Sequence, residues 1–373
     1  MAKKDRMIQT EPGSMEALSL PSALVPLVTD WFSRAGRPLP WRDSPTPYHV
    51  WLSEIMLQQT RIEAVIPYYF RFLEAFPDIP ALAEADEGRL LKLWEGLGYY
   101  SRARNLKKAA GLVAEKYGGA LPADHTALRA LPGVGDYTAG AIASIAFGLP
   151  EPAVDGNVLR LLARVSAWGE DVADPRTRKT AADALRAVYP SGPDAGLLTE
   201  GLMELGEVVC LPSGAPKCGL CPLAAFCEAR KRGEAHRLPV RSPKKERRIE
   251  ELTVVLVRCG DRVLVRRRPD GGLLGGMWEF PNFTGKLSAP DAAGELTALL
   301  GGAEVRSTQE LGGAKHLFTH VEWRMTGAEI TLSDVPRLPE GWAAATAEEM
   351  RGQYAVPTAF RKWQQIFERT GGR

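Results

Sequence analysis

Four of the five cysteines of the chain lie within one short stretch, with the spacing C-x7-C-x2-C-x5-C. They are Cys210, Cys218, Cys221 and Cys227. Thiolates held this close together can ligate a tetrahedral zinc ion or a [4Fe–4S] cluster. The loop-like intervals between them favour the iron–sulfur cluster, because zinc sites more often use paired C-x2-C knuckles. The fifth cysteine, Cys259, lies in an apolar strand pattern and is interpreted as a buried residue without ligand function.

The length of 373 residues exceeds what one hydrophobic core usually serves, so two domains are expected. The clustered cysteines do not resemble a disulfide framework of a secreted protein. The start of the chain, MAKKDRMIQT, has no apolar signal segment, and no apolar run reaches membrane length. We therefore expect a cytoplasmic protein without membrane association. The net charge of +2 is too small to identify a polyanionic partner.

The hydrophobic period changes along the chain. Residues 1–20 have no pattern and are expected to be a flexible tail, whereas 21–229 show helical periodicity. Residues 230–248 carry nine Lys or Arg against two Glu and are interpreted as a basic linker, with nucleic-acid contact left open. From 249 the period becomes that of strands, with a turn at Gly260-Asp261 and a helix near 292–300. The predicted fold class is an all-α module followed by an α+β domain.

A Gly-rich turn at 131–135 opens a small-residue helix that ends before Asp155. Gly133 and Gly135 allow positive φ and leave N–H groups bare at a helix start, where a nucleic-acid phosphate can bind. An ordinary connection between two helices is the alternative. Asp155 occupies a helix N-cap position, and a capping carboxylate that faces a cleft can also do chemistry.

Glu54 lies inside an apolar helical run predicted for 51–62. Burial would raise its pKa and suit it to acid catalysis, although this segment taken by itself favours a surface glutamate. Trp41 and Arg42 lie in a Pro-rich segment, 37–47, that is expected to be irregular; Trp41 either faces a base or caps a core. The Tyr99-Tyr100 pair, flanked by basic residues, favours contact with bases over packing in a core.

Several motifs carry a resemblance to a known family. They are SEIMLQQTR (53–61), GLGYYSRARNL (96–106), LPGVGDYTAGAI (131–142), VDGNV (154–158), GGMWEFP (275–281), HLFTH (316–320) and the cysteine cluster. Together they resemble the MutY family of adenine glycosylases, within the helix–hairpin–helix DNA glycosylase superfamily. The resemblance covers about residues 20–365, and the combination is far more specific than any single motif.

The resemblance implies a helical catalytic domain, residues 21–229, that includes a [4Fe–4S] loop at 210–227. A Nudix-like α+β domain, residues 249–369, would recognise 8-oxoguanine. The implied substrate is double-stranded DNA containing adenine opposite 8-oxoguanine or guanine. A monomer located in the cytoplasm with the nucleoid is expected.

The resemblance also implies roles for individual residues. Glu54 would protonate the flipped adenine at N7 and later activate water, while Asp155 would stabilise the developing oxocarbenium ion. Tyr137 and Asn157 match positions that support this pair, and Gly133 and Gly135 match the phosphate-binding turn. The candidate substrate-binding residues are Trp41, Arg42, Leu57, Gln59, Tyr99, Glu200, Phe318, Thr319 and His320.

The chain departs from the family pattern in informative ways. The first cysteine interval is one residue longer than usual, so we expect a bulged cluster loop. Tyr137 stands where strand-cleaving relatives carry a lysine, and a phenol cannot form the Schiff base that β-elimination needs. Thr319 replaces the more common serine. The helix near 292–300 has a single acidic residue, so no Nudix-type hydrolysis is expected.

Two other functions remain open from the sequence. An endonuclease III-like glycosylase/lyase for oxidised pyrimidines is disfavoured by Tyr137 and by the second domain. A non-catalytic iron–sulfur protein that senses DNA damage would not require Glu54 and Asp155 together.

Overall fold

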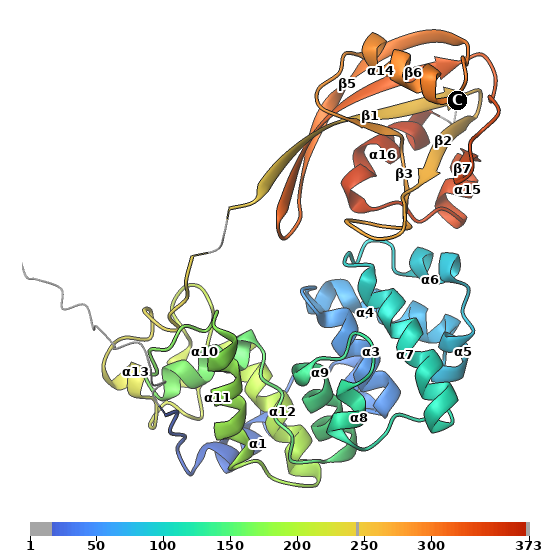
Figure 1. Cartoon of the computed structure of the whole chain (residues 1–373). Helices are drawn as coiled ribbons and strands as arrows, with labels where there is room; N and C mark the ends of the chain where they lie inside the picture. Colours follow the sequence, from blue (N-terminus) through green and yellow to red (C-terminus); the bar gives the residue numbers. More distant parts are fainter. Residues whose placement is uncertain (1–16, 244–245, 371–373) are drawn as a thin grey trace, which may run out of the picture. The chain divides into compact units, whose positions relative to one another are not determined.

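The computed structural model describes residues 17–243 and 246–370, with helices up to Lys231 and a sheet from Arg248 onward (Figure 1). The expected order of a helical part followed by an α+β part is therefore confirmed. The chain divides into two compact units by its contacts. The first contains Met1–Gln58 and Leu112–Pro243, and the second contains Gln59–Gly111 and Lys244–Arg373.

The first unit is helical. Its helices are α1 (Leu24–Ala35), α2 (Pro40–Asp43), α3 (Pro47–Leu57), α8 (His125–Arg129), α9 (Asp136–Ala141), α10 (Gly156–Val165), α11 (Pro175–Arg186), α12 (Pro193–Glu204) and α13 (Glu228–Lys231), with π-helical turns η1 (Ile142–Ala146) and η2 (Leu205–Val209) and the 3₁₀ turn η3 (Cys218–Leu220). Helix α7 (Ser101–Tyr117) contributes residues to both units. Aspartates begin several of these helices, because their carboxylates accept hydrogen bonds from otherwise unpaired N–H groups. The core of this unit is built on α1, α10 and α12.

The Pro-rich segment 37–47 was expected from its composition to be irregular, but part of it is helical. It contains helix α2 and the first residue of α3. Pro40 and Pro47 each occupy a first helical position, where the missing N–H has no intrahelical partner in any case. The helix predicted for 51–62 is also shorter than expected. It ends at Leu57, and Gln59 has a φ of 57° before a new helix starts at Ile62.

The expected flexible tail, 1–20, falls mostly outside the described residues. Its described end, 17–20, does not behave as a tail. Leu18 and Leu20 pack against the core of the first unit, and the Ser166 hydroxyl donates a hydrogen bond to the Ser19 carbonyl at 2.6 Å. Burial of these leucines explains why this part of the segment is ordered against the helices.

Two glycines allow the backbone of the first unit to pack closely around α10. A Cβ atom added to Gly140 would lie 2.2 Å from the Pro152 carbonyl oxygen. A Cβ atom on Gly206, in η2, would lie 2.5 Å from the Asn157 Cβ atom. These close approaches bring α9 and η2 against the segment that carries Asp155 and Asn157.

The second unit combines helices with a mixed sheet. Its helices are α4 (Ile62–Ala75), α5 (Ile79–Ala83), α6 (Glu87–Leu93), α14 (Ala289–Leu299), α15 (Ala347–Gly352), η4 (Thr358–Phe360) and α16 (Arg361–Thr370). Its strands are β1 (Arg248–Cys259), β2 (Arg262–Arg267), β3 (Trp278–Glu279), β4 (Asn282–Thr284), β5 (Val305–Leu317), β6 (Val321–Leu332) and β7 (Trp342–Thr346).

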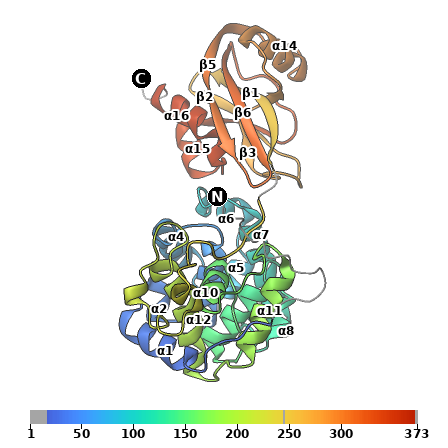
Figure 2. The same cartoon turned by 90° about the vertical axis from the view of Figure 1, so that its left-hand side faces the viewer.

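The strand order is β3-β2-β1-β6-β5, with β4 paired to β1 and β7 paired to β2. Strands β1 and β6 run parallel and the other pairs are antiparallel. Helix α14 covers one face of the sheet, and α15 and α16 cover the other (Figure 2). Because both faces are covered, the central strand β1 buries consecutive residues instead of alternating ones. Cys259, at its end, is buried as expected.

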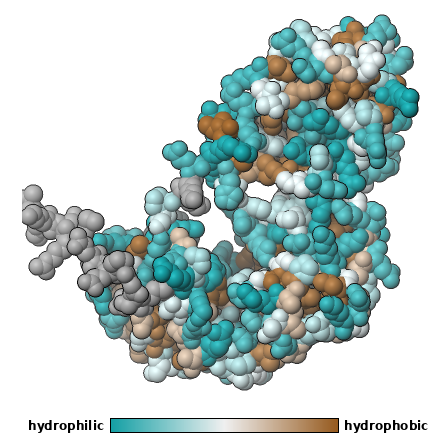
Figure 3. Space-filling model, viewed as in Figure 1, coloured by the Kyte–Doolittle hydropathy of each residue, from teal (hydrophilic) through white to brown (hydrophobic). Residues whose placement is uncertain are grey.

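The face drawn in Figure 3 is largely hydrophilic, with hydrophobic residues in scattered patches. A search of the described residues finds no helix with the length and apolar character needed to cross a membrane.

Candidate active site and cysteine cluster

Glu54 is buried, with 7% of its surface exposed, on helix α3 of the first unit. The expectation of a surface glutamate, drawn from its segment alone, is therefore wrong. Helix α3 packs against α9 and η1, and from α9 the Tyr137 hydroxyl donates a hydrogen bond to Glu54 Oε2 at 2.7 Å. The apolar surroundings and this single strong donor make Glu54 a candidate acid.

The pKa of Glu54 is raised from 4.5 to about 7. Burial is the largest cause, because it disfavours the charged form; the carboxylates of Asp155 and Glu200 act in the same direction. The hydrogen bond from Tyr137 and the charge of Arg42 oppose the shift. A carboxyl group that titrates near neutral pH can both give and accept a proton under physiological conditions.

Asp155 is the N-cap of α10, as predicted, and accepts a hydrogen bond from the Val158 N–H at 2.7 Å. Burial raises its pKa, while the N–H groups of Val158 and Asn157 and the charges of Arg160 and Arg178 lower it. Burial is the largest influence, so the pKa of Asp155 is raised overall; two backbone donors and two cations oppose that rise, whereas Tyr137 and Arg42 oppose the rise at Glu54. The two carboxyl groups, which interact electrostatically, are thus suited to different protonation states.

Tyr137 contacts Glu54, and Asn157 lies in the first turn of α10 beside Asp155. The Tyr137 hydroxyl also lies 3.0 Å from Met203 Sδ, and burial raises the pKa of this phenol well above its ordinary value, so it remains a donor. Asn157 Oδ1 accepts from Arg160 Nη2 at 2.8 Å. The same arginine donates to the carbonyls of Gly206 and Cys210, at 2.6 and 2.8 Å. Arg160 therefore links Asn157 to Cys210, the first residue of the cysteine loop.

Arg42 bridges two carboxylates of α12. Its Nε donates to Glu200 Oε1 at 2.7 Å and its Nη2 donates to Glu204 Oε2 at 3.1 Å. Glu200 and Glu204 thus share a face of the helix, as their spacing predicts. Trp41 is buried, which corresponds to the core alternative for this residue, and Leu57 is half-buried at the end of α3.

Three residues of this site were not anticipated as part of it: Glu204, Arg37 and Met203. The i, i+4 relation of Glu204 to Glu200 was the only signal in the sequence that could have pointed to the first of them.

The Gly-rich turn before α9 has one left-handed residue, not two. Gly133 has a φ of 79°, whereas Gly135, the N-cap of α9, has a φ of −94° in ordinary extended backbone. Both glycines allow positive φ, and only Gly133 adopts it. A Cβ atom added to Gly135 would meet nothing within 4 Å, so the small side chain leaves the N-terminus of α9 open.

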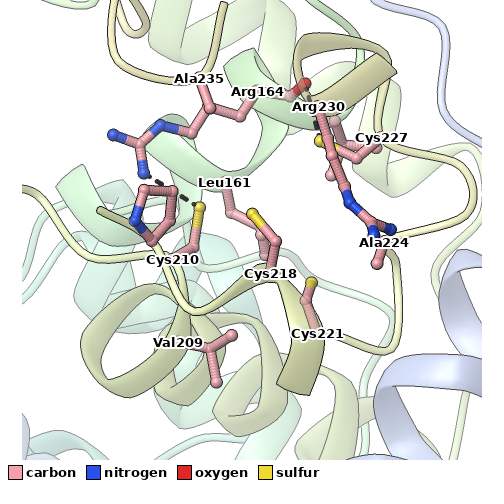
Figure 4. A pocket seen from close by; sticks show the side chains of 12 residues that line it. Leu161, Arg164, Val209, Cys210, Cys218, Cys221, Ala224, Cys227, Arg230 and Ala235 are labelled. Carbon is pink, nitrogen blue, oxygen red and sulfur yellow. Dashed lines mark hydrogen bonds between the residues drawn. The ribbon is translucent and has the colours of Figure 1, made fainter. Parts of the chain in front are cut away.

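The four clustered cysteines line one pocket of the first unit, with apolar residues such as Leu161, Val165 and Val209 around them (Figure 4). Arg164 Nη1 lies 3.3 Å from Cys210 Sγ, and the Cys227 thiol lies 3.3 Å from the Arg164 carbonyl. Burial raises the pKa of Cys221 to about 11, and the nearby Cys210, Cys227 and Cys218 act in the same direction. Across the described residues, no group of three or more His, Cys, Asp or Glu side chains is arranged for a single metal ion.

The remaining candidate residues lie in the second unit. Gln59 and Tyr99 both have positive φ, 57° and 47°, and Tyr99 is 46% exposed. The Tyr99 hydroxyl lies 3.2 Å from Thr319 Oγ1. Tyr100, in contrast, is buried in the core.

The loop that carries Thr319 is held in place by aromatic packing. Phe318 packs between His316 and Trp323, with ring centroids 4.6 and 4.8 Å away. Thr319 and His320 are exposed beyond it. Gln59, Tyr99, Thr319 and His320 thus all leave polar groups accessible on this unit.

The raised pKa of Glu54 predicts a pH-dependent stability. Because the folded-state pKa lies above the ordinary one, the contribution of Glu54 is present below about pH 4.5 and is lost as the pH rises through about 7. The free energy of unfolding of Glu54→Gln, relative to that of the wild type, should therefore increase from pH 5 to pH 8. The increase should be roughly 3 kcal/mol at most. Urea unfolding at both pH values measures this difference. Glu115→Gln, at an exposed glutamate of α7, is the control, and parallel pH dependence of the wild type and Glu54→Gln would contradict the assignment.

Comparisons with known proteins agree with this architecture. Residues 52–188 match the HhH-GPD superfamily of base excision DNA repair proteins, and residues 253–365 match the NUDIX domain. The adenine DNA glycosylase of Mus musculus is 35% identical over 91% of this chain and 76% of its own length, and that of Homo sapiens is 34% identical over 91% and 72%. A solved structure of a thermostable thymine-DNA glycosylase matches with a TM-score of 0.50 and 26% identity, over 56% of this chain and 96% of that one. The chain belongs to the adenine DNA glycosylase family of the HhH-GPD superfamily.

Proposed function

We propose that this protein removes adenine from double-stranded DNA where the adenine lies opposite 8-oxoguanine or guanine. The observation that carries the proposal is the carboxyl pair in the first unit. Glu54 is buried with a pKa near 7, and Asp155 is held at a helix N-terminus among donors and cations. Two carboxyl groups in unequal environments are what cleavage of a glycosidic bond by acid catalysis requires.

The proposed mechanism begins with a protonated Glu54, which donates its proton to N7 of an adenine flipped out of the helix. Protonation makes the base a leaving group, so the N-glycosidic bond breaks and positive charge develops on the sugar. The carboxylate of Asp155 stabilises that charge through a transient bond to the anomeric carbon, which breaks when water attacks this carbon and the carboxylate is released. Glu54, now ionised and still hydrogen-bonded to Tyr137, accepts a proton from the attacking water.

The residue at position 137 bears on strand cleavage. β-Elimination after base removal needs an amine that forms a Schiff base with the sugar. This position carries a phenol whose raised pKa keeps it protonated, and it contacts Glu54 directly. We infer a monofunctional glycosylase with little or no lyase activity.

Recognition of the base opposite adenine is assigned to the second unit. Tyr99 contacts Thr319, and Phe318 is fixed by two aromatic neighbours, so this group offers an ordered surface with exposed hydrogen-bonding side chains. Gln59 and His320 are assigned to the same role. In the first unit, the open N-terminus of α9 at Gly133 and Gly135 is assigned to a DNA phosphate.

The cysteine pocket is assigned to a [4Fe–4S] cluster. A cube needs four thiolates and apolar surroundings, and this pocket brings four cysteines and several apolar side chains together. Cys210, Cys218, Cys221 and Cys227 would hold it, with Arg164 beside Cys210 to offset negative charge on sulfur. When bound, the cluster cross-links the loop through four iron–thiolate bonds. We further propose a monomer that acts in the cytoplasm on nucleoid DNA.

The first test is base release from duplexes that contain adenine opposite 8-oxoguanine. The wild type should give strand breaks only after alkali treatment, because base removal leaves an intact backbone. Glu54→Gln should bind the same duplex but release adenine at least about 1000-fold more slowly, since it cannot donate the proton. A thymine glycol duplex is the comparison. Direct nicking of that duplex indicates an endonuclease III-like enzyme, and tight binding without base release by the wild type indicates a non-catalytic sensor.

The second test concerns the opposite base. Phe318→Ala removes the ring that packs between His316 and Trp323, so the loop should lose its order and the preference for 8-oxoguanine over guanine should fall about tenfold. The ratio of single-turnover rates on the two duplexes measures this preference. His320→Ala should lower the same ratio without loss of packing. An unchanged ratio in both variants would contradict the recognition assignment.

The third test identifies the metal. Protein purified without air should be brown with broad visible absorbance, because thiolates bound to iron give charge-transfer bands. Cys218→Ser should reduce the iron content, whereas Cys259→Ser, at the buried cysteine outside the pocket, should retain it. A colourless protein that contains zinc would refute the cluster.

A further inference from the structure

Glu204 is a buried carboxylate with no part in the proposed reaction. Only 2% of it is exposed, yet it is surrounded by cationic donors. Its Oε1 accepts from Arg37 Nε at 2.5 Å and from the Arg37 backbone N–H at 3.3 Å. Its Oε2 accepts from Arg37 Nη2 and from Arg42 Nη2, each at 3.1 Å. Burial acts to raise the pKa of Glu204, but the two arginines leave it below its ordinary value, so the group is ionised.

Arg42 is immobilised by this carboxylate and by three other groups. Its Nη1 donates to the Arg37 carbonyl at 2.9 Å and its Nε donates to Glu200 at 2.7 Å. Its guanidinium also stacks on the Phe32 ring, 4.9 Å from the centroid. A planar guanidinium with partners on every nitrogen has one available orientation, so Arg42 presents its Nε to Glu200 in a defined direction.

Glu200 is the member of this chain of contacts that acts on Glu54. It is close enough to Glu54 to raise the pKa of that group. Arg42 binds its Oε1, and within the described part of the chain its Oε2 receives no hydrogen bond. Burial raises the pKa of Glu200, and Arg42 is the main opposing influence. Arg42 thus favours an ionised Glu200 that still has one oxygen available as an acceptor.

We propose that Glu204 is a positioning residue for adenine selectivity, which acts by fixing Arg42 and thereby aims Glu200 at the exocyclic amine of the flipped base. The inference rests on the proposed function and on the role as a substrate-binding residue that the family resemblance implies for Glu200. A carboxylate is an acceptor only, and the N6 amine is the donor that distinguishes adenine from a purine without it. Without Glu204, Arg42 would lose one of its two anionic partners and could rotate toward Glu200 alone.

The test compares two bases opposite 8-oxoguanine: adenine and unsubstituted purine, which lacks the amine but retains N7. Single-turnover excision rates give an adenine-to-purine ratio for each variant. Glu204→Gln should lower this ratio about tenfold, because a misdirected Glu200 loses its charge-assisted hydrogen bond to the amine, whereas a change in proton donation by Glu54 to N7 acts on both bases and cancels in the ratio. Glu200→Gln should lower it similarly, and the double variant should lower it no further than Glu200→Gln alone. Asp194→Asn, at an exposed residue of the same helix, should leave the ratio unchanged.

The outcomes separate this inference from the proposed function. Equal losses on both bases in Glu204→Gln would show a purely structural role and would overturn the inference, as would an effect of Glu204→Gln that persists in the Glu200→Gln background. A wild type that releases no adenine would instead refute the proposed function. If Glu204→Gln does not fold, Arg42→Lys replaces it, because an ammonium group cannot bridge both carboxylates. Arg42→Lys should also lower the adenine-to-purine ratio. An unchanged ratio in this variant would overturn the inference.

Discussion

The candidate site in the first unit depends on the hydrogen bond from the Tyr137 hydroxyl to Glu54. A carboxyl group in apolar surroundings is costly unless it is protonated or paired, and here one phenol meets it while burial moves its pKa to about 7. The bond forms only because α3 and α9, which lie far apart in the sequence, pack side by side. Helix α9 also approaches the segment before α10 closely at Gly140, where any side chain would collide with the Pro152 carbonyl.

Helix α10 connects the carboxyl pair with the cysteine pocket. Its first turn carries Asp155 as the N-cap, and one turn later Arg160 binds Asn157 and the carbonyl of Cys210. A further turn along, Arg164 reaches the Cys210 thiol. The two arginines lie on one face because they are four residues apart. A single rigid helix therefore sets the position of the second carboxylate relative to the loop that the cluster would cross-link.

Some site features could be anticipated from local chemistry. Asp155 was expected to be an N-cap because Asp at a helix start satisfies bare N–H groups, and the structure has that bond. Glu200 and Glu204 share a face because they lie four residues apart in α12. Glu54 was different: its segment favoured a surface position, since the neighbours that bury it come from α9 and α12. Gly135 likewise has ordinary backbone, because a glycine permits positive φ without requiring it.

The sequence by itself determined the two-part architecture, the cysteine pocket and the family, since these depend on hydrophobic period, spacing and motif. Tertiary structure alone decided which charges are buried and which meet. The pairing of Arg37 and Arg42 with Glu204 joins residues more than 160 positions apart. Such ion pairs produce no pattern in the local sequence, because their members come from helices that are distant in the chain. Packing of these helices removes the charged side chains from water, and a buried charge is stable only when it is paired.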